Sequence, residues 1–313
     1  MSAADLHVPV LLDTCMELLA PALTEPSLLI DATLGMGGHT EAALTRFPNL
    51  RVVGIDRDPE AIRLASERLA PFGDRFVAEH AEYDQIGRIA EKHGRPQGIL
   101  MDLGVSSLQL DDASRGFAYA QDAPLDMRMD TSQGPTAQDL ISSSTHGELA
   151  RIISTYGEER FAGKIASKIM NHPDRDHLTT SQLADLVKEA IPAAARRTGG
   201  NPAKRTFQAL RIAVNDEMAI LERALPAAME CLDVGGRLVV ESYHSLEDRI
   251  VKRAMTEGAT SSTPIGVPVD LDTPPFTLIT KKAIQADAAE IARNPRSASV
   301  RVRACEKTSK GRQ

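Results

Sequence analysis

Short apolar runs alternate with amphipathic stretches along the first third of the chain. Mostly apolar segments, which predict strands, occur at 28–34, 51–56, 74–80 and 98–104. In the stretches between them, apolar residues recur every three or four positions, which predicts helices. Because parallel strands are joined by crossover helices, this alternation predicts right-handed β-α-β units and a parallel sheet.

The alternation stops after residue 110. Residues 111–135 are rich in Asp, Gly, Pro and Ser, and they predict a long loop. The pattern over 136–190 predicts helices only, and a basic break rich in Gly, Pro and Arg follows at 193–205. After this break a single long helix is predicted over 205–232.

Strand patterns return near the end of the chain. The run RLVVE at 237–241 follows a glycine turn, and two further runs at 276–282 and 298–307 close the sequence. Together with the first four strands they predict a seven-stranded sheet whose last strand is antiparallel.

The order of these patterns predicts two structural parts. An α/β domain formed by residues 1–114 and 211–313 is interrupted by an all-helical insertion at 115–210. The 313 residues suffice for a large core, and 42% hydrophobic with 25% charged residues is typical of a globular chain. We find neither an apolar run of membrane-spanning length nor a signal-peptide pattern, so no membrane partner is expected.

The three cysteines, Cys15, Cys231 and Cys305, lie far apart and form no spaced pair. This spacing argues against a disulfide framework and against a zinc site, so we expect no metal. Unpaired cysteines are also typical of a reducing compartment, which favours a cytoplasmic location.

The net charge of −7 conceals two basic regions. Residues 151–211 carry eleven Lys and Arg against six Asp and Glu, and residues 292–313 carry seven against one. Local patches matter more for phosphate binding than the total charge does. On charge alone, the favoured interpretation of both regions is ordinary solvated surface.

The stretch DATLGMGGHT at 31–40 lies between a predicted strand and a predicted helix, as nucleotide-binding turns do. It matches G-x-G-x-x-G only in part, because Thr40 stands at the third glycine position. Asp56 ends the second predicted strand, 21 residues after Gly35. A carboxylate at that place can accept both hydroxyls of a ribose.

Asp31, directly before this turn, separates two classes of cofactor. A pyrophosphate would bring negative charge to the carboxylate, which is unfavourable in a partly desolvated site. S-adenosylmethionine (SAM) carries a sulfonium and an ammonium, so the acid favours SAM over a nicotinamide dinucleotide. A long helix followed by DVGG and a strand is also common in SAM-dependent methyltransferases. A purely structural role for Asp31 as a cap of the turn stays open.

Polar residues follow the fourth and fifth predicted strands. Ligands bind beyond the carboxyl ends of parallel strands, so Asp102 and Gln109 are expected at the same rim as Tyr243 and His244. His39 is expected to contact the cofactor, since the sequence places no acid to tune it as a base.

Two local patterns can be explained by structural roles alone, as a helix cap and as a self-packed loop. Ser245 and Asp248 form a capping pattern for the helix that follows. In the loop 115–130, four residues can contact substrate: Arg115, Phe117, Asp126 and Arg128. Alternatively, the loop can be packed on its own Met and Phe side chains.

With these residues in hand, the chain resembles the bacterial small-subunit ribosomal RNA methyltransferase H family over almost its full length. The motifs that carry the resemblance are HVPVLL (7–12), DATLGMGGHT (31–40), GIDRDP (54–59), DLGVSSLQLDDASRGF (102–117), PLDMRMD (124–130), TYGEERFAGKIA (155–166), RTFQALRIAVN (205–215), YHSLEDRIVK (243–252) and NPRS (294–297).

The resemblance implies a class I SAM-dependent methyltransferase fold, Rossmann-like and seven-stranded, with an inserted helical substrate-recognition domain. It also implies methylation of the exocyclic N4 of a cytidine in the decoding region of 16S rRNA, within the 30S subunit. Seven residues would hold SAM: Gly37, Gly38, His39, Asp56, Tyr83, Asp102 and Gln109. The family often has Phe where this chain has Tyr83, so this chain retains the aromatic ring and adds a hydroxyl group to it.

Asp102 is the first candidate to accept the N4 proton, although Asp-Leu-Gly-Val replaces the Asn/Asp-Pro-Pro-aromatic motif of many amino-methyltransferases. Nine residues are expected to contact RNA or substrate: Arg115, Phe117, Arg128, Arg196, Arg197, Lys204, Arg205, Tyr243 and His244. A protein or small-molecule methyltransferase, a non-catalytic RNA-binding assembly factor and an NAD-dependent oxidoreductase are the alternatives. A homo-oligomer is compatible with the sequence.

Overall fold

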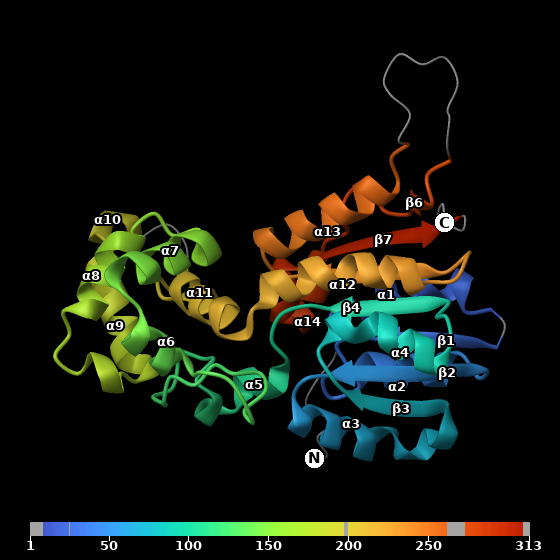
Figure 1. Ribbon diagram of the computed structural model, residues 1–313, viewed down its shortest axis with the longest axis horizontal. Coiled ribbons are helices and arrows are strands. Elements are labelled where there is room, and N and C mark those ends of the chain that lie inside the picture. The colour runs from blue at the N-terminus through green and yellow to red at the C-terminus, as the bar shows by residue number, and fades with distance from the viewer. Residues whose placement is uncertain (1–8, 25, 197–199, 262–272, 309–313) are drawn as a thin grey trace, which may run out of the picture. The chain divides into compact units, whose positions relative to one another are not determined.

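The computed structural model describes residues 9–24, 26–196, 200–261 and 273–308 (Figure 1). Its seven-stranded sheet has the strand order β3-β2-β1-β4-β5-β7-β6. Five strands are parallel: β1 (Ser27–Asp31), β2 (Leu50–Asp56), β3 (Phe76–His80), β4 (Gly98–Asp102) and β5 (Arg237–Ser242). Two are antiparallel additions at one edge: β6 (Phe276–Leu278) and β7 (Arg301–Lys307). The seven-stranded sheet and its antiparallel last strand are therefore confirmed.

Helices cover both faces of the sheet (Figure 1). One face packs against α1 (Leu12–Leu19), α2 (Gly38–Arg46) and α3 (Pro59–Leu69), and the other against α4 (Ile86–His93), α12 (Glu217–Cys231) and α13 (Ser245–Gly258). Neighbouring residues of a strand serve opposite faces: Leu28 and Ile30 join one core and Leu29 joins the other. This double burial is why the strands read as continuous apolar runs.

The helices of the insertion enclose a separate apolar core. They are α5 (Ser107–Asp111), α6 (Ala137–Ser143), α7 (His146–Gly157), α8 (Ala162–Met170), α9 (Thr180–Ala190), α10 (Ala193–Arg196) and α11 (Lys204–Asn215). Capping boxes begin α6, α7 and α9, so Thr136, Thr145 and Thr179 fix three helix starts. A last short helix, α14 (Ala288–Arg293), precedes β7.

The chain divides into two compact units, which we call the sheet unit and the helical unit. The sheet unit comprises residues up to Gly104 and from Met218 onward, and the helical unit spans Val105–Glu217. The helical unit extends beyond the 115–210 expected from sequence, because Val105 and Leu110 pack against its core and α11 runs to Asn215.

The prediction of a single helix over 205–232 is wrong. Asp216 adopts a left-handed conformation (φ 50°) and separates α11 from α12. A non-glycine residue in this region interrupts the helical hydrogen-bond ladder, and nothing in the amphipathic pattern marks such a break. No helix in the described part of the chain is both long and apolar enough to cross a membrane.

Candidate functional site

Three carboxylates stand at the carboxyl ends of neighbouring strands of the sheet unit. Asp31 ends β1, Asp56 ends β2 and Asp102 ends β4. The chain order reverses between β1 and β4, and in open parallel sheets this switch point is where ligands bind. The glycine turn leads from β1 into α2 at the same edge.

Asp31 is held by the residues of the turn. The hydroxyl of Thr40 donates a 2.7 Å hydrogen bond to its Oδ2, and the backbone N–H of Thr33 donates to its Oδ1 at 3.3 Å. Burial raises the pKa of Asp31, while nearby His39 opposes this shift. Thr40, which departs from the glycine fingerprint, therefore has a structural role as a hydrogen-bond donor to Asp31.

The glycines of the turn allow close packing of the backbone. Gly37 has a φ of +77° and precedes α2, and a Cβ atom there would lie 3.0 Å from the Leu69 side chain. A Cβ atom on Gly38 would lie 2.7 Å from the ring of Pro9. No larger residue fits at these positions without displacing a neighbour.

Asp56 connects β2 to this turn. It accepts hydrogen bonds from the backbone N–H groups of Gly35 (2.8 Å) and Asp58 (2.9 Å). Burial raises the pKa of the carboxyl to about 6 against the opposition of these donors. Tyr83, the predicted adenine neighbour, begins a short 3₁₀ turn after β3 and packs partly buried against the core.

If Asp56 holds the ribose, as the resemblance implies, SAM affinity should decrease as the pH falls through about 6, because the protonated carboxyl could no longer accept both hydroxyls. Calorimetric titration with SAM between pH 5 and pH 8 measures this change. Asp56→Asn is the control, since it has no proton to take up at this position. A pH dependence that is equally steep in Asp56→Asn would contradict the assignment.

Asp102 and Tyr243 form a close pair. The hydroxyl of Tyr243 donates a 2.7 Å hydrogen bond to Asp102 Oδ1, and Thr33 Oγ1 accepts the backbone N–H of Asp102 at 2.6 Å. Partial burial raises the pKa of Asp102 to about 6; the Tyr243 hydrogen bond lowers it and the charge of Glu247 raises it. Oδ2 receives no hydrogen bond from the described residues, and His39 Nδ1 lies 3.8 Å from it.

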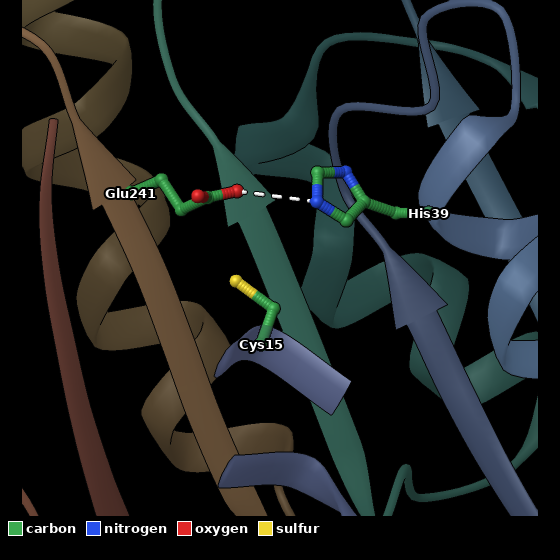
Figure 2. Close-up of side chains that lie close together, drawn as sticks. All are labelled: Cys15, His39 and Glu241. Atoms are coloured by element: carbon green, nitrogen blue, oxygen red, sulfur yellow. Dashed lines mark ion pairs between the residues drawn. The ribbon is translucent and has the colours of Figure 1, made fainter. Parts of the chain in front are cut away.

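His39 is buried at the start of α2 and lies between carboxylates. Its Nε2 is 3.2 Å from the carbonyl oxygen of Val10 and 3.5 Å from Glu241 Oε2 (Figure 2). Burial lowers the pKa of the imidazole, although Asp31 favours its charged form. His39 therefore has acidic neighbours that come from distant parts of the sequence.

The cap of α13 differs from the predicted Ser245–Asp248 pattern. His244 is the N-cap residue, and its ring accepts the backbone N–H of Glu247, whose carboxylate in turn accepts the N–H of His244. Asp248 instead binds Arg303 at 2.7 Å on β7. The cap prediction is therefore wrong. Ser245 is the first residue inside the helix, and Asp248 is bound by Arg303, a partner that is distant in sequence.

Residues predicted on the loop of the helical unit are largely engaged there. Arg115 is buried and donates to the carbonyl oxygens of Arg128 and Met129, and Phe117 is buried in the helical core. The guanidinium of Arg128 makes a two-point pair with Asp126. Gln109 is buried and completes the capping box of α5.

The predicted phosphate contacts lie at the start of α11. Lys204 and Arg205 are both exposed, and Arg205 donates to the carbonyl oxygen of Glu158 at 3.2 Å. Arg197 and the side chain of Arg196 lie outside the described residues.

Sequence reasoning missed two residues beside His39. Glu241 on β5 and Cys15 on α1 are fully buried, and their functional atoms approach His39 (Figure 2). A charged residue within the apolar run RLVVE was the one available signal for Glu241, because such a strand position is normally apolar.

The comparisons with known proteins agree over nearly the whole chain. The profile of the MraW methylase family matches residues 4–308. A protein of Beutenbergia cavernae called ribosomal RNA small subunit methyltransferase H is 59% identical over 97% of this chain and 93% of its own. A protein of the same description from Nocardioides sp. is 57% identical over 97% and 98%.

Proposed function

Since the chain belongs to the MraW methylase family, we propose that it transfers a methyl group from SAM to the exocyclic N4 of a cytidine in the decoding region of 16S rRNA. The observation that carries the proposal is the acidic edge of the sheet unit, where Asp31, Asp56 and Asp102 surround the glycine turn. We place the reaction in the cytoplasm, with the 30S subunit as the substrate particle.

The residues at this edge fit SAM. The three carboxylates of this edge favour a ligand that carries a sulfonium and an ammonium, and they disfavour a pyrophosphate. Asp56 would hold the ribose, Gly37 and Gly38 would admit the methionine end, and Tyr83 would flank the adenine. Bound SAM supplies a methyl group that the sulfonium has already activated.

Asp102 is suited to act on the cytidine. The lone pair of N4 is delocalised into the ring, so an acceptor for N4–H must localise that pair and receive the proton. Tyr243 fixes Asp102 through Oδ1, while Oδ2 receives no hydrogen bond from the described residues. A pKa of about 6 leaves the carboxylate ionised at neutral pH and close enough in basicity to accept a proton.

We expect the double variant Lys204→Gln/Arg205→Gln to weaken binding to 30S particles and to reduce its salt dependence. Removing one ion pair with a phosphate reduces the steepness of log K against log[salt] by about 0.7 to 0.9. Lys281→Gln/Lys282→Gln is the matched control, because it removes two exposed charges from the sheet unit. A slope that changes equally in both variants, or in neither, would reject these two residues as phosphate contacts.

The reaction itself is tested with 30S subunits from a strain that lacks this methylation. The subunits are incubated with the protein and methyl-labelled SAM, and the modified nucleoside is mapped by mass spectrometry. N4-methylcytidine at one decoding-region position would support both the reaction and the substrate. Measurable SAM binding without label in the RNA would overturn the proposal and redirect the search to proteins and small molecules.

A further inference from the structure

Three buried side chains from distant parts of the sequence converge in the sheet unit. Cys15 comes from α1, His39 from the start of α2 and Glu241 from β5, and Figure 2 shows their functional atoms directed toward one space. One ligand atom from each residue lies within 4.8 Å of the other two. His39 Nε2 and Glu241 Oε2 are 3.5 Å apart.

Glu241 makes this cluster unusual. Its side chain is fully buried, and the weakly donating thiol of Cys15 and the imidazole of His39 are the polar groups of the described residues that face its carboxylate. An ionised carboxylate in such a place is strongly unfavourable unless a cation balances it.

We propose that Cys15, His39 and Glu241 bind a divalent transition metal, with Zn²⁺ as the expected ion. Thiolate, imidazole and carboxylate are the three ligand types that zinc uses in proteins. Two nitrogen or oxygen ligands at about 2.1 Å from a tetrahedral zinc lie about 3.4 Å apart, close to the His39–Glu241 separation. A thiolate at Cys15 and a carboxylate at Glu241 would together balance the two positive charges of the ion.

The surroundings of His39 support this assignment. Nε2 faces Glu241, while Nδ1 faces Asp102 Oδ2 at 3.8 Å. Metal-binding histidines commonly present their second nitrogen to a carboxylate in this way. Nε2 is hydrogen-bonded to the carbonyl oxygen of Val10 at 3.2 Å, and metal binding at Nε2 would replace that hydrogen bond.

The metal would join three elements of the sheet unit. It would tie α1 and the glycine turn to the centre of the sheet, and so hold His39 in place beside Asp102. This site is not needed for the proposed methyl transfer as such, so its test does not depend on that activity.

Cobalt(II) is the probe for the first experiment, because a thiolate-bound Co²⁺ has a charge-transfer band that oxygen and nitrogen ligands do not produce. Full-length protein prepared with a chelator, and then freed of the chelator, is titrated with Co²⁺. We expect the band to saturate at one ion per chain and to disappear when Zn²⁺ is added. Absence of the band in correctly folded protein would overturn the proposal.

Variants identify the ligands. Cys15→Ser should abolish the band, and Glu241→Gln should keep it but weaken Co²⁺ binding by about tenfold or more. Cys231→Ser is the matched control: this half-buried thiol lies outside the cluster and its loss should change nothing. A band that persists in Cys15→Ser and vanishes in Cys231→Ser would place the metal elsewhere.

Thermal unfolding supplies a second readout that does not depend on colour. Zn²⁺ bound only to the native state should raise the Tm of the wild-type protein. In chelator, Glu241→Gln should unfold at or above the wild-type temperature, because it removes a fully buried acidic group and keeps the shape of the side chain. With Zn²⁺ present, the wild-type protein should be the more stable of the two. The same order of stability in both solutions would contradict metal binding by Glu241.

Discussion

Replacing Asp102 with Asn should lower kcat for methyl transfer by about 10²- to 10⁴-fold, which is the usual contribution of a positioned general base. The amide preserves the shape of the side chain and still accepts the hydrogen bond from Tyr243. It cannot take up the proton that leaves N4. Turnover with saturating SAM and 30S particles measures the loss, and near-normal turnover would end the acceptor role of Asp102.

The variant Tyr243→Phe distinguishes proton acceptance by Asp102 from a purely structural role of that side chain. Burial raises the pKa of Asp102 to about 6, and the Tyr243 hydrogen bond opposes that increase. Without the hydroxyl the pKa should move higher, so the acidic limb of the kcat profile should shift toward neutral pH. An unshifted limb in Tyr243→Phe would indicate that the titrating group is not Asp102.

Replacing Asn215 with Ala should destabilise the helical unit by about 3 to 5 kcal/mol, because buried backbone groups lose their partners. Asn215 Oδ1 accepts the backbone N–H of Met129, and Nδ2 donates to the carbonyl oxygens of Met127 and Arg211. The side chain therefore fastens the loop at 127–129 to the end of α11. Met127 and Met129 are both buried, so water cannot readily replace the amide as their partner.

Amide hydrogen exchange measures this effect locally, which suits a chain with two compact units. We expect protection in α11 and at residues 127–129 to fall by about 10²- to 10⁴-fold in Asn215→Ala, the range that corresponds to this loss of stability. Asn171→Ala, at the exposed end of α8, is the control and should leave protection unchanged. Equal exchange in the two variants would show that the clamp contributes little.

The sheet could be predicted from sequence because its determinants are local. A strand buried on both faces is apolar along its whole length, as Leu28, Leu29 and Ile30 illustrate, and such a run stands out between polar helix patterns. The same logic places Asp31, Asp56 and Asp102 at one edge. Strand ends were less well predicted: the run at 276–282 forms only the short β6.

The remaining features depend on partners that are distant in sequence. Cys15, His39 and Glu241 meet across more than 200 residues, so no spacing rule for metal ligands detects them. The clamp by Asn215 and the pairing of Asp248 with Arg303 have the same origin. Asp216 is different: its left-handed conformation is local, yet nothing in the helical pattern distinguishes it from an ordinary helix residue.

The placement of the helical unit within the chain fixes an order of events during synthesis. β4 ends at Asp102 and its parallel neighbour β5 begins at Arg237, so the whole helical unit is made before these strands can pair. The helical unit can form its local contacts early, whereas the nascent sheet waits with β4 as an open edge. Unpaired strand edges attract other chains, so β4 is exposed to such pairing until β5 has been made.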